Sequence, residues 1–307
     1  MSIVLAILGA VGQGMLWGVM ALGVYITFRI LNFADMTCDG SFALGGCVSV
    51  ILIATFHMNP FLSLIFAVGA GMLAGLITGL LHTRLKIPAI LSGILTMIGL
   101  YSINIRILGK KSNVSLLKSN TLVTLIKDNM PGFITDSMKD STLSSTVVLG
   151  FGLLVVILLI VVLYWFFGTE AGSALRATGN NEDMIRALGQ NTDRMKILGL
   201  VIGNGLVALS GAFVAQSQGY ADVDMGQGTI VIGLASIVIG EAVLFGKRKS
   251  FYKKLAAIIV GSLIYRIVIA IVLQLGLETN DLKLLTALIV ATALAIPGIK
   301  KQGRRAR

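Results

Sequence analysis

Long apolar runs separated by short polar breaks fill almost the whole chain. They cover roughly residues 3–28, 60–81, 89–108, 146–167, 197–215, 229–245, 255–275 and 282–299. Each run is near the length of about 20 residues that an α-helix needs to cross a bilayer. A shorter run of small residues at 42–55 either crosses or re-enters. The pattern therefore predicts an all-α membrane bundle of about eight or nine transmembrane helices.

Residues 168–197 form the longest polar interruption that keeps a helix-forming periodicity. Its charged side chains include Arg176, Glu182 and Arg186, which cannot lie cheaply in hydrocarbon. We expect short helices on the cytoplasmic surface, with these three residues as candidates for contact with a partner. For each, the alternative is a local role around a short helix capped at Asn181.

The other long hydrophilic segment is 109–145, which mixes lysines with aspartates. Long loops are translocated in spite of positive charge, so its lysines do not keep it inside. We expect an extracytoplasmic segment with small surface helices.

A polar break follows the first apolar run and holds Asn32, Asp35, Asp39, Gly40 and Ser41. It predicts irregular backbone before a helix, which at membrane depth is tolerated where it lines a cavity or is buried in protein. An ordinary capped loop at the interface is the alternative.

The stretch 34–40 resembles the stretch 221–228, and each precedes an apolar run of small residues. In the expected topology the first faces the cytoplasm and the second faces outward. This arrangement would suit an inverted repeat.

Arg266 lies near the middle of an apolar run, where its charge costs about 2.5–3.5 kcal/mol on insertion scales. It should face the bundle interior beside an anionic partner. Glu241, Asp35 and Asp39 are the candidates, and a structural ion pair and a contact with substrate both stay open.

Composition agrees with a membrane protein, with 56% hydrophobic and 13% charged residues. The net charge of +11 lies in short loops and the tail rather than on one basic face, which argues against nucleic-acid binding. The same asymmetry places the C-terminus in the cytoplasm. We expect one transmembrane domain over residues 1–307, in a plasma membrane.

The motif Gly172–Asn181, followed by Ala187-Leu188-Gly189, resembles the coupling segment of permease subunits of bacterial ABC importers of the branched-chain amino acid and ribose type. Leu209–Ala212 resembles the small-residue helix that follows it. The stretch 31–35 resembles the amino-acid branch, and 39–45 resembles the sugar branch.

The resemblance implies a cytoplasmic ATPase dimer, a second permease subunit and an extracytoplasmic binding protein. A homodimer is favoured, and the substrate is expected to be a small polar solute, an aromatic or branched-chain amino acid before a sugar or nucleoside. Residues implied in ATPase coupling are Gly172, Arg176, Ala177, Asn181, Glu182, Arg186 and Gly189. Candidate pathway residues are Asn32, Asp35, Asp39, Ser41, Asn204, Glu241 and Arg266.

The chain has no phosphate loop of the GxxxxGK[ST] form, so ATP and magnesium are expected in the partner, and no cofactor is expected here. An ion-coupled secondary transporter, with Asp35, Asp39, Glu241 and Arg266 as its relay, is the alternative, and the long charged inner segment argues against it. A membrane enzyme is disfavoured, because the chain has no HExxH motif and no cysteine–histidine pair.

Overall fold

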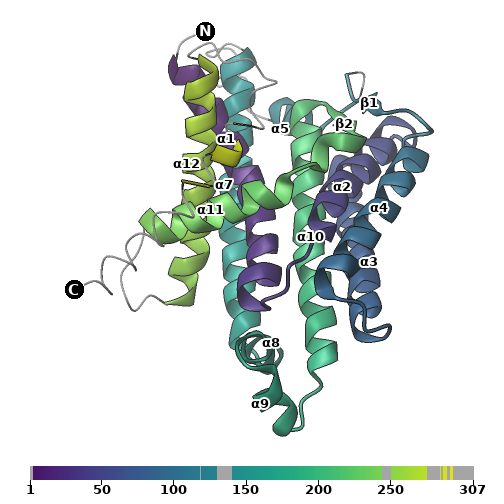
Figure 1. Cartoon of the computed structure of the whole chain (residues 1–307). Helices are drawn as coiled ribbons and strands as arrows, with labels where there is room; N and C mark the ends of the chain where they lie inside the picture. The colour runs from purple at the N-terminus through teal and green to yellow at the C-terminus, as the bar shows by residue number, and fades with distance from the viewer. Residues whose placement is uncertain are drawn as a thin grey trace.

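The computed structural model of the protein describes residues 3–117, 119–129, 140–243 and 250–274, together with 284, 286–288 and 291–292. Within these residues, eight helical segments are long and apolar enough to cross a membrane (Figure 1). The long helices are α1 (Ile3–Val24), α2 (Thr37–Ala54), α3 (Pro60–Thr83), α4 (Ala89–Ile107), α7 (Asp140–Gly168), α10 (Thr192–Gln218), α11 (Thr229–Val243) and α12 (Phe251–Gln274). The expected all-α membrane bundle is confirmed.

Helix α10 stands at the centre of the bundle. It packs against α2 and α3 on one side and against α1 on the other (Figure 1). Helices α7, α11 and α12 gather around α1, whereas α4 packs on α2 and α3. Helix α11 lies across the bundle, at a steep angle to α10 and α12 (Figure 1).

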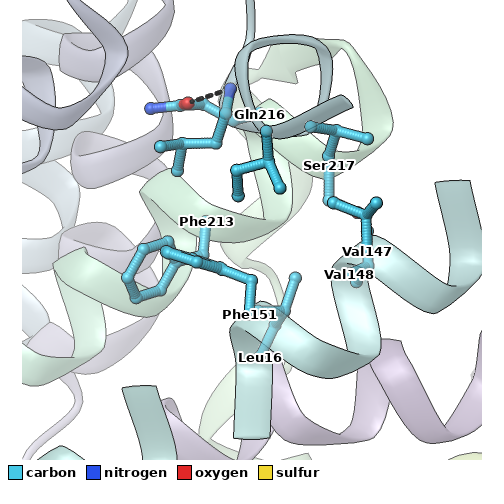
Figure 2. A pocket seen from close by; sticks show the side chains of 10 residues that line it. Leu16, Val147, Val148, Phe151, Phe213, Gln216 and Ser217 are labelled. Carbon is cyan, nitrogen blue, oxygen red and sulfur yellow. Dashed lines mark hydrogen bonds between the residues drawn. The ribbon is translucent and has the colours of Figure 1, made fainter. Parts of the chain in front are cut away.

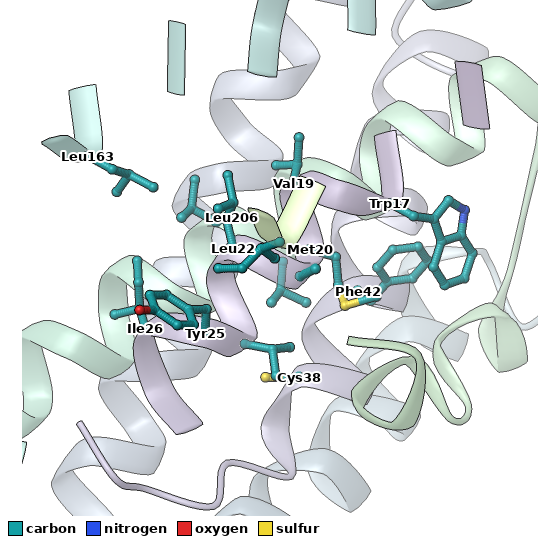
Figure 3. Packing of buried hydrophobic residues seen from close by; sticks show 14 of the residues in the cluster. Trp17, Val19, Met20, Leu22, Tyr25, Ile26, Cys38, Phe42, Leu163 and Leu206 are labelled. Carbon is teal, nitrogen blue, oxygen red and sulfur yellow. The ribbon is translucent and has the colours of Figure 1, made fainter. Parts of the chain in front are cut away.

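The largest apolar core lies where α1 meets α2 and α10. Figure 3 shows Trp17, Met20 and Leu22 of α1 beside Phe42 and Leu206. The rings of Trp17 and Phe42 lie 4.9 Å apart between centroids, in a tilted arrangement. Since α1 is buried over most of its length, it belongs to the interior rather than to the lipid-facing surface.

Short elements close one end of the bundle. Strands β1 (Asn113–Ser115) and β2 (Tyr220–Asp222) pair antiparallel, and the short helix α5 (Leu122–Asp128) lies near them (Figure 1). A small surface helix is what the sequence predicts for this segment. Residues 130–139 of the segment are outside the described part of the chain.

Gln216 ties this end together from inside, where only 1% of its surface is exposed. Its Nε2 donates to Ser49 Oγ at 2.8 Å and Ser63 Oγ at 3.1 Å, and its Oε1 accepts from the backbone N–H of Leu122 at 3.2 Å. Figure 2 shows Gln216 above a small apolar hollow that Phe151 and Phe213 help to line. One side chain thus joins α2, α3, α5 and α10.

Some predicted boundaries shift. The short run at 42–55 belongs to an 18-residue helix, α2, which is long enough to cross. Helix α7 begins at Asp140, so the hydrophilic segment ends before the predicted residue 145. The predicted span 282–299 lies largely outside the described residues.

Candidate functional site

The polar break after α1 is an abrupt change of backbone direction. Helix α1 continues into the π-helical turn η1 (Tyr25–Ile30), after which residues 31–36 are irregular. Asn32 is exposed and adopts a left-handed conformation with φ of 56°, which asparagine tolerates better than most residues do. The predicted irregular backbone before α2 is therefore present.

Asp35 is almost completely buried within this segment, with 1% exposure. Its Oδ2 accepts from Asn204 Nδ2 at 2.6 Å, and its Oδ1 accepts from the backbone N–H of Thr37 at 3.0 Å. Ser41 Oγ in turn donates to Asn204 Oδ1 at 2.7 Å. Three of the predicted pathway residues are thus brought together, in a closed polar contact between the start of α2 and the middle of α10.

Asp39 makes a different connection, to the start of α11. Its Oδ1 accepts from Thr229 Oγ1 at 2.8 Å and from the backbone N–H of Ile230 at 2.9 Å. Its Oδ2 accepts from the backbone N–H of Gly228 at 2.9 Å. A carboxylate at a helix N-terminus satisfies N–H groups that lack partners within the helix.

The two similar stretches, 34–40 and 221–228, meet at Asp39, and their facing of opposite sides of the membrane stays a prediction. The 3₁₀ turn η2 (Val223–Gly226) follows β2 and packs on α2, where Gly226 lies against the backbone carbonyl of Asp39. Any side chain at this glycine would collide with that carbonyl. Both stretches enter the bundle and meet there.

An open hollow of about 410 Å³ lies beside this meeting point. Helices α2 and α4 and the turn η2 form its walls. Polar lining residues are Asp39, Tyr101, Asn104, Asp224 and Gln227, and the others are apolar or glycine. Sequence reasoning missed Tyr101 and Asn104, although Asn104 is a strongly polar side chain inside an apolar run and could have been noticed.

The expected partners of Arg266 are engaged elsewhere. Glu241 forms a two-pronged ion pair with Arg29, with both N–O distances at 3.0 Å, so the pairing of Glu241 with Arg266 is wrong. The guanidinium of Arg266 lies instead over the ring of Trp17, 4.0 Å from its centroid. Within the described residues Arg266 forms no ion pair.

The segment 168–197 folds as expected into short helices, α8 (Glu170–Asn180) and α9 (Glu182–Ala187), at the far end from β1 and β2 (Figure 1). Arg176 donates to the backbone carbonyl of Phe167 at 2.9 Å and lies over the ring of Phe251. The backbone of Gly179 touches the carbonyl of Ile30 where η1 ends. Helix α8 is therefore held by α7, η1 and the start of α12.

Gly172 is buried against the end of α7, and Ala177 is half-buried. Asn181 caps α9 by accepting from the backbone N–H of Met184 at 3.0 Å, which is the local role considered from the sequence. Gly189 ends α9 with φ of 81°, a conformation that suits glycine. These residues shape the two short helices.

Glu182 is the centre of a polar cluster on α9. It accepts from Arg186 at 2.6 Å and Lys196 at 2.8 Å, and from Thr192 Oγ1 at 3.1 Å. Partial burial raises the pKa of Glu182, but its bonds to Lys196, Thr192 and Arg186 outweigh this, so the pKa lies below its usual value. Two of the predicted contact residues thus pair within the chain.

The outer face of α9 carries exposed apolar side chains that the sequence reasoning passed over. Met184 is 50% exposed, and Leu188, four residues later, is 69% exposed. Residues four apart lie on one face of a helix. An exposed apolar pair on a short charged helix is typical of a surface that a partner protein covers.

The sequence profile described as "Branched-chain amino acid transport system / permease component" matches residues 6–294. The chain belongs to this family. It is 41% identical over 289 residues, 94% of this chain and 90% of the relative, to a protein named "Tyrosine transport system permease protein" from Clostridioides difficile. It is 28% identical over 214 residues, 67% of this chain and 64% of the relative, to a "Probable branched-chain amino acid transport permease protein" from Methanocaldococcus jannaschii.

Among solved structures, "PsaBC from Streptococcus pneumoniae in complex with Fab" covers 94% of this chain and 87% of its own, with a TM-score of 0.48 and 16% identity. Family membership makes the chain a multi-pass permease subunit of an ABC importer for amino acids, and not itself an enzyme. ATP binding lies in a partner ATPase, and a binding protein delivers the solute. The ion-coupled alternative is therefore set aside.

Proposed function

We propose that this permease imports an aromatic amino acid of the tyrosine type. The observation that carries the proposal is 41% identity, over 94% of the chain, to a relative named for tyrosine transport. The similarity to the branched-chain relative is weaker, at 28% over 67% of the chain. Aromatic solutes therefore come before branched-chain ones, and sugars or nucleosides come last.

The ATPase binds at α8 and α9, and this end faces the cytoplasm, as does the C-terminus. The exposed pair Met184 and Leu188 supplies apolar contact, because Glu182 and Arg186 are engaged with each other. Arg176 holds α8 against the membrane helices and so passes the movement of α8 to α7 and α12. Gly172, Ala177, Asn181 and Gly189 act by shaping the two helices.

Leu188→Asp tests this surface. The variant should assemble poorly with the ATPase. It should also stimulate ATP hydrolysis by the ATPase at least about tenfold less than the wild-type permease does, because a carboxylate replaces an apolar contact. Leu117→Asp is a matched control when both measurements are made without the binding protein, since Leu117 is 92% exposed at the opposite end. Equal ATPase stimulation in both variants would remove α9 from the interface.

The binding protein docks at the opposite end, on β1, β2 and α5. Two copies of this chain form the membrane part, with the pathway between them. The open hollow beside Asp39 and the segment around Asn32 lie along that pathway. Asp35, Ser41 and Asn204 are hydrogen-bonded to one another, and these bonds hold the wall of the pathway in place.

Uptake of labelled solutes by proteoliposomes tests the whole proposal. Vesicles that carry the permease with its ATPase, ATP inside and the binding protein outside should accumulate L-tyrosine before L-leucine, and exclude ribose. Mass photometry of the same complex should fit two copies of this chain. Failure to accumulate any amino acid, or accumulation without ATP, would contradict the proposal.

A further inference from the structure

We propose that the hollow among α2, α4 and η2 is a binding site for the ammonium group of the transported amino acid. The inference rests on the proposed function and adds the group of the substrate that is recognised within the membrane subunit. The volume of the hollow, about 410 Å³, lies within the range of roughly 300–1,000 Å³ in which small-molecule sites are found.

Asn104 gives the clearest sign of a ligand. It is buried, with 1% exposure, and it lines the hollow. Its Nδ2 donates to the backbone carbonyl of Gly40 at 3.4 Å, whereas its Oδ1 has no partner among the described residues. A buried acceptor without a donor is costly, because it has lost the hydrogen bonds of water without replacement. A donor from a bound molecule would satisfy it.

The charges of the residues that line the hollow determine which kind of ligand donor can bind there. Asp39 and Asp224 are both on the wall, and the described lining residues include no lysine or arginine. Asp39 is already occupied by three donors from the start of α11. Asp224 is exposed and accepts from Gln227 Nε2 at 2.6 Å through one oxygen, Oδ1. Its remaining acceptor capacity and Oδ1 of Asn104 together suit a cation with several N–H donors, which describes a primary ammonium.

The rest of the wall is suited to the side chain of such a ligand. Met97, Ile98 and Val223 are apolar, and Tyr101 adds a ring that is 47% exposed. A thioether and an aromatic ring make favourable contacts with another aromatic group. The hollow therefore combines a site for a positive charge with a surface for an aromatic side chain.

Binding to the permease–ATPase complex in nanodiscs, without the binding protein, tests the site. Labelled L-tyrosine should bind and be displaced by tyramine, which keeps the ammonium. N-acetyl-L-tyrosine, which lacks it, should not displace the label. Displacement by both compounds would overturn the ammonium assignment.

Variants locate the site. Asp224→Asn, at an exposed position, and Asn104→Leu, inside the bundle, should each weaken L-tyrosine binding by about tenfold or more, since each removes an acceptor for a charged donor. Asp128→Asn, the same change on α5 outside the hollow, should bind as the wild type does.

Unchanged binding in Asp224→Asn would overturn the proposal even if Asn104→Leu fails to fold. Wild-type complex that binds no L-tyrosine but still imports it with the binding protein would overturn the site and leave the proposed function intact. Absence of amino-acid import would instead count against the proposed function.

Discussion

The carboxylate of Asp39 caps the first turn of a helix that begins 190 residues later, through Thr229 Oγ1 at 2.8 Å. Both backbone N–H groups that flank Thr229 also donate to Asp39. One side chain therefore fixes where α11 starts, and its hydrogen bonds connect the α2 side of the bundle to the α11 side.

Asp39→Asn should lower the stability of the folded permease by about 1–2 kcal/mol, because an amide offers one acceptor oxygen where the carboxylate offers two. Thermal unfolding in detergent, followed by size-exclusion fluorescence, measures the change. Thr229→Val should cost less, since both backbone donors remain. A melting temperature for Asp39→Asn equal to that of Asp128→Asn would show that the cap contributes little.

Asn204→Leu should be more damaging, at about 1.5–3 kcal/mol, because it removes the 2.6 Å amide donor of the buried carboxylate of Asp35 and leaves the weak Cys38 Sγ donor on the same oxygen. Asn204 also accepts from Ser41, so that hydroxyl loses a partner as well. The double variant Asp35→Asn with Asn204→Leu should recover part of the loss. Thermal unfolding measures the loss of stability in each single variant and in the double variant. If the losses of Asp35→Asn and Asn204→Leu simply add in the double variant, Asp35 and Asn204 do not act together.

The stability of the fold should depend on pH through Glu182. Its pKa is lowered in the folded protein, so its pairing stabilises the fold above its ordinary pKa of 4.5 and is lost as the pH falls through the lower folded value. The pair is partly exposed, and the effect should stay below about 1 kcal/mol. The melting temperature of wild type minus that of Glu182→Gln should be positive at pH 7 and shrink below about pH 4.5. A difference that does not change with pH would contradict this role.

Arg266→Met should leave the fold as stable as before, or make it more stable. An arginine at mid-span costs about 2.5–3.5 kcal/mol, and stacking on Trp17 returns only about 0.5–2 kcal/mol. Thermal unfolding and ATP-driven uptake should be measured on the same preparation. Loss of uptake without loss of stability would show that the charge serves transport, whereas a large drop in melting temperature would reveal a structural partner.

Sequence reasoning works well here for everything set by the bilayer. The lengths of apolar runs predict the spanning helices, and the polar segment 168–197 predicts the short helices α8 and α9. It fails for contacts between distant segments. The pairing of Glu241 with Arg29 rather than Arg266 depends on how α11 meets η1, and that of Asp39 with Thr229 depends on how α11 meets α2. Periodicity within each segment does not contain this information. The exposed pair Met184 and Leu188 was missed because two apolar residues among charges resemble an ordinary buried helix face.

Gln216 has a mechanical consequence for transport. Since it fastens α2, α3 and α5 to α10 at one end, that end cannot open by parting these helices without exposing a fully buried amide and breaking several hydrogen bonds together. Opening at that end would therefore have to move α2, α3, α5 and α10 together as one unit.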